Sequence, residues 1–138
     1  MTPVFADTLY WIGTFVANDP WAEAVHAIDL SEVALVTTEE VLTEFLTAVS
    51  GYGEQMRRLA CRSVREILDD PRIEVVEQSH ESFVGGLSLY ERRPDKQYSL
   101  VDCISMNVMR RGSITQVLTN DRHFSQEGFA VLLPRKAS

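Results

Sequence analysis

Short apolar runs alternate along this chain with longer stretches in which apolar residues recur at helical spacing. The runs predict five strands, at 4–6, 33–36, 73–76, 116–119 and 129–133. The longer stretches predict helices over 9–17, 21–28, 39–50, 54–68 and 99–111, with a weaker one from residue 79. Strands separated by helices are typical of a parallel sheet that is covered on both faces. The predicted fold class is therefore α/β, with a central parallel sheet of about five strands flanked by helices.

Local signals mark several of these boundaries. Thr38 is suited to cap the helix that follows it, and Ser79 opens the next weak helix. Pro20 fits the first position of the second helix, where no N–H is needed. Gly85 and Gly86 together cost the weak helix about 1–2 kcal/mol relative to alanine.

Length and composition predict one domain over residues 1–134 and a short tail over 135–138. The 138 residues are 45% hydrophobic and 24% charged, as in ordinary globular proteins. Cys61 and Cys103 lack CxxC spacing, and we expect reduced core thiols and a cytoplasmic location. No basic residue precedes the first apolar stretch, and no apolar run reaches the roughly 18 residues of a membrane span. We expect neither a signal peptide nor a membrane partner.

The net charge of −7 argues against a protein that coats nucleic acid, because such binding needs cations to neutralise phosphates. It does not exclude an enzyme that acts on nucleic acid, since a carboxylate-rich metal site is itself negative. Arg58, Arg62 and Arg65 share one helical face, which fits either a solvated surface or an RNA path.

Four acidic residues, far apart in sequence, occupy positions where burial is expected. Asp7 and Asp121 follow predicted strands, Asp102 lies in a first helical turn, and Glu44 interrupts an apolar helical stripe. Ligands of such sheets bind beyond the carboxyl ends of the strands, and all four acids can reach that edge. Because unpaired buried charges are costly, a shared divalent cation is the first hypothesis.

Three of these acids also have a purely structural explanation. Asp7 with Thr8 could cap the first helix, Ser99 with Asp102 resembles a capping box, and Asp121 could belong to a turn. Glu44 is harder to explain, because its helix offers no basic partner at helical spacing.

The ligand types favour Mg²⁺ or Mn²⁺. Oxygen donors without clustered histidines or cysteines suit these ions better than Zn²⁺. The three histidines, His26, His80 and His123, are scattered, and only His123, two residues after Asp121, is placed to approach the site. No nucleotide-binding glycine loop or nucleophile elbow occurs.

Taken together, the motifs resemble a PIN domain, specifically a VapC-type toxin ribonuclease of a toxin–antitoxin system. The segments that carry the resemblance are 5–8 (FADT), 41–44 (VLTE), 99–102 (SLVD), 118–124 (LTNDRHF) and 128–132 (GFAVL). The resemblance covers almost the whole chain, and the two motifs at 99–102 and 118–124 are the specific ones. The chain departs from the family at Leu9, where a second small hydroxyl residue is common, which leaves the acids intact.

The resemblance implies a three-layer PIN-like sandwich and a metal-dependent endoribonuclease, a hydrolase that cleaves RNA with metal-activated water. It implies that Asp7, Glu44, Asp102 and Asp121 form the catalytic, metal-holding quartet for Mg²⁺ or Mn²⁺. It further implies that Thr8, Ser99 and Thr119 support these acids, and that the partners are RNA, a cognate antitoxin and a second copy in a homodimer. The target among transfer, ribosomal and messenger RNA stays open.

Two other functions remain as alternatives. A catalytically inactive PIN-like module could bind RNA or protein, although it would have little reason to keep four costly charges. A receiver-like phosphoacceptor domain would need paired acids after the first strand and a late lysine, whereas Asp7 stands alone and Lys96 precedes Asp102. For the dimer we expect apolar residues of the early helices to take part, with Trp21 as an exposed anchor; the set is Val16, Trp21, Val25, Tyr52 and Met56.

Overall fold

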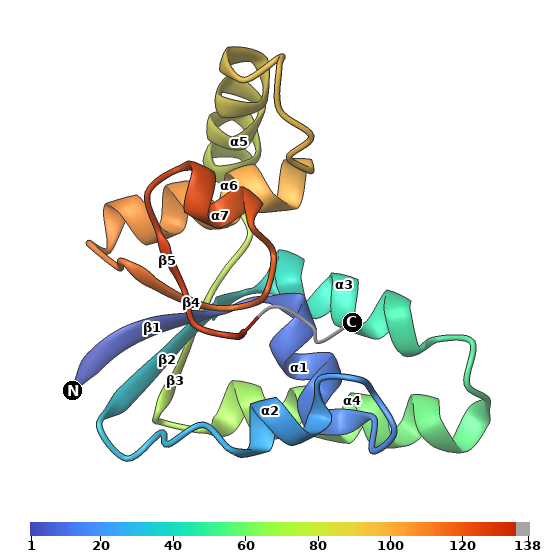
Figure 1. Cartoon of the computed structure of the whole chain (residues 1–138). Coiled ribbons are helices and arrows are strands. Elements are labelled where there is room, and N and C mark those ends of the chain that lie inside the picture. Colours follow the sequence, from blue (N-terminus) through green and yellow to red (C-terminus); the bar gives the residue numbers. More distant parts are fainter. Residues whose placement is uncertain (135–138) are drawn as a thin grey trace.

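The computed structural model describes residues 1–134 and contains one five-stranded, wholly parallel sheet in the order β3-β2-β1-β4-β5 (Figure 1). The strands are β1 (Thr2–Ala6), β2 (Val33–Thr38), β3 (Ile73–Val76), β4 (Gln116–Leu118) and β5 (Ala130–Val131). The predicted α/β class and the predicted number of strands are confirmed.

The strand order puts β1 at the centre of the sheet. The chain builds outward from β1 through β2 to β3, then returns to the other side of β1 for β4 and β5. The direction of winding therefore reverses between β1 and β4. In open parallel sheets, ligands bind beyond the carboxyl ends of the strands at such a reversal. Asp7 follows β1 directly, so the topology places this acid at the reversal.

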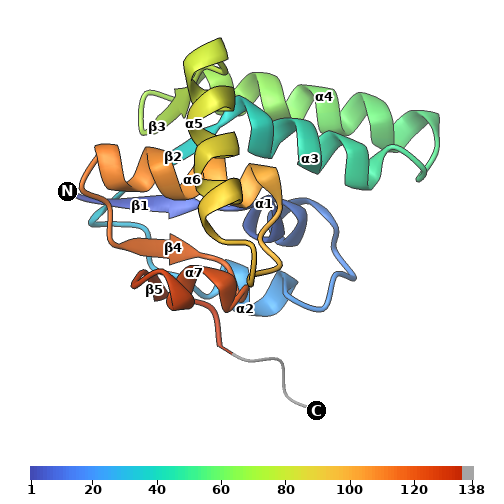
Figure 2. The same cartoon turned by 90° about the horizontal axis from the view of Figure 1, so that it is seen from above.

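Residues 1–134 form seven helices around the sheet: α1 (Thr8–Phe15), α2 (Ala22–His26), α3 (Glu39–Val49), α4 (Glu54–Asp69), α5 (His80–Arg92), α6 (Leu100–Arg111) and α7 (His123–Gln126). Helices α5 and α6 lie on one side of the sheet, and α1, α2 and α4 lie on the other (Figures 1 and 2). Helix α5 crosses over α6 (Figure 2) and stands away from the sheet (Figure 1). This arrangement is the three-layer sandwich that the sequence predicts.

The second half of the central strand β1 lies in the core. Val4, Phe5 and Ala6 are almost completely buried, although they alternate between the two faces of the sheet. Burial on both faces is expected for a parallel strand covered by helices on each side. Phe45 and Phe124 fill the core from the two sides. A polar residue placed directly after β1 is therefore surrounded by buried apolar side chains.

Most predicted boundaries are confirmed within a few residues. Thr38 caps α3, and its hydroxyl accepts a hydrogen bond from the Val41 amide at 3.0 Å. Ser79 caps α5 and Ser99 caps α6, each in a reciprocal capping box. These caps could be predicted from the sequence because a serine or threonine hydroxyl accepts a hydrogen bond from one of the amides that the first turn of a helix leaves unpaired.

Three local predictions are wrong. Pro20 does not occupy the first position of α2; it lies in the turn before Trp21, which is the residue that caps this helix. The last strand is shorter than predicted, Ala130–Val131. Helix α7 was not predicted, because its single turn is too short to show an apolar period.

The two cysteines differ in their surroundings. Both are free thiols, as predicted, and Cys103 is buried, but Cys61 is exposed on α4, so it is not a core residue. Among residues 1–134, no helix is long and apolar enough to cross a membrane. The predicted tail, 135–138, lies outside the described residues.

Exposed apolar side chains do not gather on the early helices as expected. Val25 is 3% exposed, and Val16 and Trp21 pack partly against the core. Tyr52 is exposed, at the turn between α3 and α4. The exposed apolar side chains gather instead on the outer face of α5, which we call the α5 patch: Phe83, Val84, Leu87 and Tyr90.

We predict opposite effects from alanine at two adjacent glycines of α5. A Cβ at Gly86 would stand 2.5 Å from Ile104 Cγ1 of α6, whereas a Cβ at Gly85 would meet only Asn107 Nδ2 at 3.6 Å. Gly86→Ala should lower the free energy of unfolding by about 1–3 kcal/mol through overpacking. Gly85→Ala should raise it by about 0.5–1 kcal/mol through helix propensity. Urea unfolding of the two variants measures both values, and equal effects would contradict the close packing of α5 on α6.

Candidate metal centre

All four predicted acids line one cavity of about 580 Å³ at the carboxyl end of β1 and β4. They come from four separate segments: Asp7 from the end of β1, Glu44 from α3, Asp102 from α6 and Asp121 from the loop after β4. Thr8 and Thr119 line the same cavity. The convergence expected from the topology is therefore present in the structure.

Asp7 is the most deeply buried of the acids, with 8% of its surface exposed. It occupies the cap position of α1, yet its side chain makes no capping hydrogen bond. Burial raises the pKa of Asp7 from its ordinary 3.8 to about 7; the Thr8 amide and the Thr119 hydroxyl oppose this rise, and the charges of Asp102 and Glu44 add to it. The structural explanation of Asp7 as a simple helix cap is therefore not supported by its contacts.

Glu44 has a hydroxyl partner on another helix. Its Oε1 accepts a hydrogen bond of 2.6 Å from Thr8 Oγ1, which joins α1 to α3. Burial raises the pKa of Glu44, the bond from Thr8 opposes the rise, and the charge of Asp102 adds to it. The partner was invisible to helical spacing because it lies 36 residues away in sequence.

Asp102 serves the fold and the cavity at once. Its Oδ2 accepts a hydrogen bond from the Ser99 amide at 3.0 Å, and the Ser99 hydroxyl accepts one from the Asp102 amide at 3.0 Å. This is the predicted capping box of α6. Burial is nevertheless the main influence on Asp102 and raises its pKa, with the charge of Asp121 acting in the same direction. The capping box therefore fixes the orientation of a carboxylate that still borders the cavity.

Asp121 is held by the turn that follows β4. Its Oδ1 accepts a hydrogen bond from the His123 amide at 2.9 Å, and its own amide donates to Thr119 Oγ1 at 3.2 Å. Turn chemistry and a place in the cavity are thus compatible explanations for this residue. The turn sets the carboxylate opposite Asp102.

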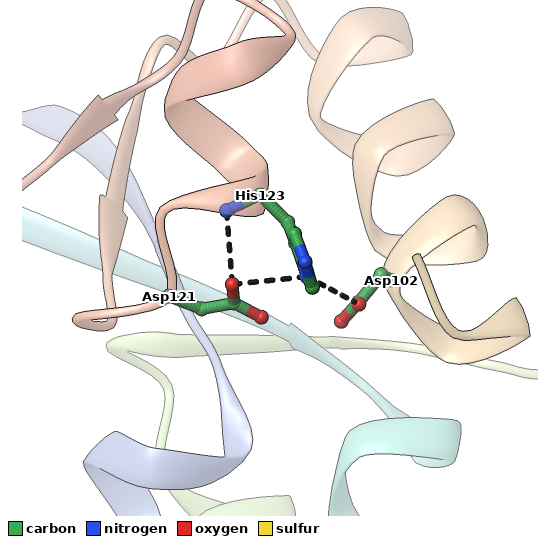
Figure 3. Close-up of side chains that lie close together, drawn as sticks. All are labelled: Asp102, Asp121 and His123. Atoms are coloured by element: carbon green, nitrogen blue, oxygen red, sulfur yellow. Dashed lines mark hydrogen bonds and ion pairs between the residues drawn. The ribbon is translucent and has the colours of Figure 1, made fainter. Parts of the chain in front are cut away.

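His123 joins the acids at this point. Figure 3 shows its ring between the carboxylates of Asp102 and Asp121, with Nδ1 3.1 Å from Asp121 Oδ1 and 3.8 Å from Asp102 Oδ2. These three residues offer ligand atoms that all lie within 4.8 Å of one another. Of these three residues, Asp102 and Asp121 line the cavity together with Asp7 and Glu44, and His123 lies directly behind them. The sequence hinted at His123 only through its position two residues after Asp121.

Two residues of the cavity were missed by the sequence analysis. Asp19 lines it as a fifth acid, although its carboxylate accepts a hydrogen bond from the Trp21 amide at 2.9 Å and so also shapes the turn before α2. Trp21 was expected as an exposed anchor, but it is half-buried and lines this cavity with Leu9 and Ile12. Acids thus face an apolar wall, and neither residue had a spacing signal that pointed to the quartet.

The donor set suits a divalent cation. No lysine or arginine from residues 1–134 lines the cavity, so no fixed positive charge balances the carboxylates there. Burial and mutual repulsion raise the pKa of Asp7, Glu44 and Asp102, as expected for acids that lack a counter-charge. A bound Mg²⁺ or Mn²⁺ would remove this deficit, because such ions bind carboxylate oxygens.

The α4 arginines occupy a different place. Arg57, Arg58, Arg62 and Arg65 line a separate hollow of about 740 Å³ along α4, together with three acids, Glu54, Glu66 and Asp69. Arg58 pairs with Glu54 at 2.7 Å while both side chains stay largely in solvent. Near balance of charge favours a solvated surface over an RNA path here.

Comparison with known proteins identifies the class. Residues 4–129 match the PIN domain family, and the chain belongs to that family. Among solved structures it is similar to the crystal structure of VapC20 from Mycobacterium tuberculosis, described as a sarcin–ricin loop cleaving toxin. The TM-score is 0.83 at 24% sequence identity, covering 95% of this chain and 99% of VapC20. No match was found among curated protein sequences.

The raised pKa of Asp7 predicts that the metal-free protein loses stability as the pH rises from about 4 to about 8. In that range the folded protein keeps a proton on Asp7 that the unfolded chain has released, so each rise in pH favours unfolding. A change from 3.8 to about 7 corresponds to a loss of up to roughly 4 kcal/mol. Asp7→Asn should remove most of this loss in urea unfolding with EDTA present.

The matched control is Asp95→Asn, whose carboxyl group is largely in solvent in the loop before α6. It should leave the pH dependence unchanged. A wild-type protein whose free energy of unfolding rises steadily from pH 4 to 8, with Asp7→Asn identical to it, would contradict the burial of an uncompensated acid.

Proposed function

We propose that this chain is a divalent-metal-dependent endoribonuclease that hydrolyses RNA phosphodiester bonds and acts as the toxin of a toxin–antitoxin pair. The observation that carries the proposal is the convergence of four carboxylates in one cavity that no lysine or arginine of the described part of the chain, 1–134, lines. Membership of the PIN domain family and the fold similarity to VapC20 support it. A binding module without activity would gain nothing from these mutually repelling groups.

Asp7, Glu44, Asp102 and Asp121 would hold Mg²⁺ or Mn²⁺. When bound, the cation orients the scissile phosphate, lowers the pKa of the attacking water and stabilises charge on the leaving oxygen. The hydroxyl of Thr8 keeps Glu44 directed at the cavity, and Ser99 does the same for Asp102. Thr119 supports two of the acids. Its hydroxyl lies near the Asp7 carboxyl group and accepts a hydrogen bond from the Asp121 amide. All three predicted supporting residues thus have contacts that suit this role.

The apolar wall of the cavity suits the rest of an RNA substrate. Leu9, Ile12 and Trp21 face the acids, and an indole surface can stack on a nucleobase of any sequence. When the phosphate of a nucleotide lies near the acids, the base or ribose of that nucleotide would therefore lie against the apolar wall. VapC20 is described as cleaving the sarcin–ricin loop, so a hairpin of that loop is a rational first substrate to test. Transfer RNA and messenger RNA remain the other candidates.

Loss of one acid should abolish most RNA cleavage. Asp7→Asn and Asp102→Asn should each reduce the rate constant for cleavage by a factor of about 100 or more, because stabilisation of the transition state by metal contributes several kcal/mol. The measurement uses sarcin–ricin hairpin and total RNA with Mg²⁺ or Mn²⁺, and excess EDTA should stop the reaction. Unfolding curves of the variants verify that they are folded.

Glu39→Gln is the matched control. Glu39 lies on α3 like Glu44 but outside the cavity, and glutamine retains an oxygen for the hydrogen bond from the Gln78 amide. The control should cleave RNA like the wild type. Full activity of Asp7→Asn, or cleavage that persists in EDTA, would sink the metal mechanism. Tight RNA binding without cleavage under any metal would favour the inactive PIN-like module.

We also propose a homodimer and an inhibitory antitoxin. Clustered exposed apolar side chains often mark interaction sites, and the α5 patch gathers four of them on one helix. We therefore assign the dimer contact to α5, in place of the early helices considered from the sequence. A basic side chain of the antitoxin would meet five acids in a cavity that no lysine or arginine of residues 1–134 lines, and pairing with them would exclude the metal.

Sedimentation velocity should show a species of about twice 15.6 kDa for the pure chain. Leu87→Glu should shift it toward the monomer, because burying that charge in an apolar interface is unfavourable. Tyr52→Ser, at an exposed site 57% open to solvent away from α5, should remain dimeric. If the wild-type chain is a monomer and does not bind the product of the adjacent gene on co-expression, both the homodimer and the antitoxin proposals are wrong.

A further inference from the structure

Beside the acidic cavity lies a polar network centred on the buried carboxylate of Glu127, the C-cap residue of α7. Its side chain is 6% exposed and accepts four hydrogen bonds. Arg93 donates through Nε at 2.9 Å and through Nη2 at 3.2 Å, Arg110 donates at 2.6 Å, and the Tyr98 hydroxyl donates at 2.9 Å. The donors come from the end of α5, the loop before α6 and the last turn of α6. One carboxylate therefore ties α7 to three other segments.

The same network reaches the active site through one aromatic ring. The Tyr98 ring lies edge to face with the imidazole of His123, with 5.4 Å between ring centroids and 63° between planes. His123 is the first residue of α7 and Glu127 is its C-cap, so Tyr98 contacts both ends of this short helix. An imidazole held by a buried, hydrogen-bonded tyrosine has little freedom to turn away from the carboxylates.

The imidazole nitrogen that faces the acids has no hydrogen-bond partner. Nδ1 of His123 is inaccessible to solvent and makes no hydrogen bond among residues 1–134, although Asp121 Oδ1 is only 3.1 Å away. The direction is wrong for a proton on Nδ1 to be donated to that oxygen. Burying a nitrogen without a hydrogen-bond partner costs free energy. A ligand bound between this nitrogen and the carboxylates of Asp102 and Asp121 would remove that cost.

We propose that His123 is a nitrogen ligand of the divalent cation together with Asp102 and Asp121, and that Tyr98 and Glu127 are the residues that position it. The inference rests on the proposed metal-dependent function and adds a ligand to the acidic quartet. Ligating histidines are usually oriented by neighbouring groups, and loss of such a neighbour weakens metal binding about 10–100-fold. Here the orienting group is an aromatic ring anchored to a buried carboxylate.

The network is suited to this task because it does not change its protonation near neutral pH. Its arginine bonds lower the pKa of Glu127 to about 2, and burial with the bond to Glu127 raises that of Tyr98 to about 12. The hydroxyl thus remains a donor and the carboxylate an acceptor. A nitrogen donor also shifts preference from Mg²⁺ toward transition-metal ions such as Mn²⁺, since Mg²⁺ favours oxygen.

Pulsed electron paramagnetic resonance of the protein with one equivalent of Mn²⁺ tests the ligand directly. Coupling between Mn²⁺ and a ¹⁴N nucleus should be present in the wild type, should change to a ¹⁵N pattern with ¹⁵N-histidine, and should vanish in His123→Ala. His80→Ala, which removes an exposed histidine of α5, should retain it. Titration should show Mn²⁺ affinity lowered about tenfold or more in His123→Ala, with Mg²⁺ affinity much less affected.

Two tyrosine variants test the positioning role. Tyr98→Leu removes the ring and should weaken the nitrogen coupling and lower the ratio of Mn²⁺ to Mg²⁺ affinity, whereas Tyr98→Phe retains the ring and should retain most of both. Tyr52→Leu, at an exposed tyrosine outside the network, should match the wild type. Glu127→Gln should resemble Tyr98→Leu if it folds, and the tyrosine pair remains decisive if it does not.

The outcomes separate the two levels of the proposal. Mn²⁺ that binds and supports RNA cleavage without nitrogen coupling overturns the ligand role of His123 and leaves the nuclease intact. Coupling that is unchanged in Tyr98→Leu, with only the unfolding free energy lowered, overturns the positioning role. Absence of both Mn²⁺ binding and cleavage refutes the proposed function itself.

Discussion

The cost of burying carboxylates without a counter-charge governs this structure. Asp7 follows a central strand that is buried on both faces, and its environment favours the protonated acid up to about pH 7. Glu44 and Asp102 stand near enough to raise that cost further. Such an arrangement weakens the fold unless something positive enters. A cation bound in the cavity would relieve this unfavourable interaction, so that metal binding would also stabilise the fold.

Three of the acids are held in place by hydrogen bonds that also stabilise the local structure around them. The capping box of α6 fixes Asp102, the turn after β4 fixes Asp121, and a bond between two helices fixes Glu44. Each of these three acids thus has one oxygen that accepts a structural hydrogen bond, and its other oxygen is left for the cavity. This dual use explains why the structural and functional interpretations of a single acid could not be separated from sequence. They were never exclusive.

The parts of the molecule that the sequence predicts are those governed by local physics. Apolar periodicity gave the strands and long helices, hydroxyl caps gave their starts, and strand alternation with helices gave the parallel sheet that brings Asp7 and Asp121 to one edge. What it missed depends on distant contacts. Thr8 as the partner of Glu44 and Asp19 as a fifth acid of the cavity have no spacing signal. Pro20 was misplaced because the turn at Asp19 overrides the preference of proline for a first helical position.

Helix α7 shows why a short element can matter more than its length suggests. One turn has too few hydrogen bonds to be stable alone, so its position must come from tertiary contacts. Phe124 anchors it in the core, and Glu127 binds the guanidinium groups of Arg93 and Arg110. Because α7 is fixed at its far end by charge and in its middle by packing, its first residue is held in place beside the acids. The salt bridges of Glu127 thus fix the position of His123 beside the acids, although they lie outside the cavity.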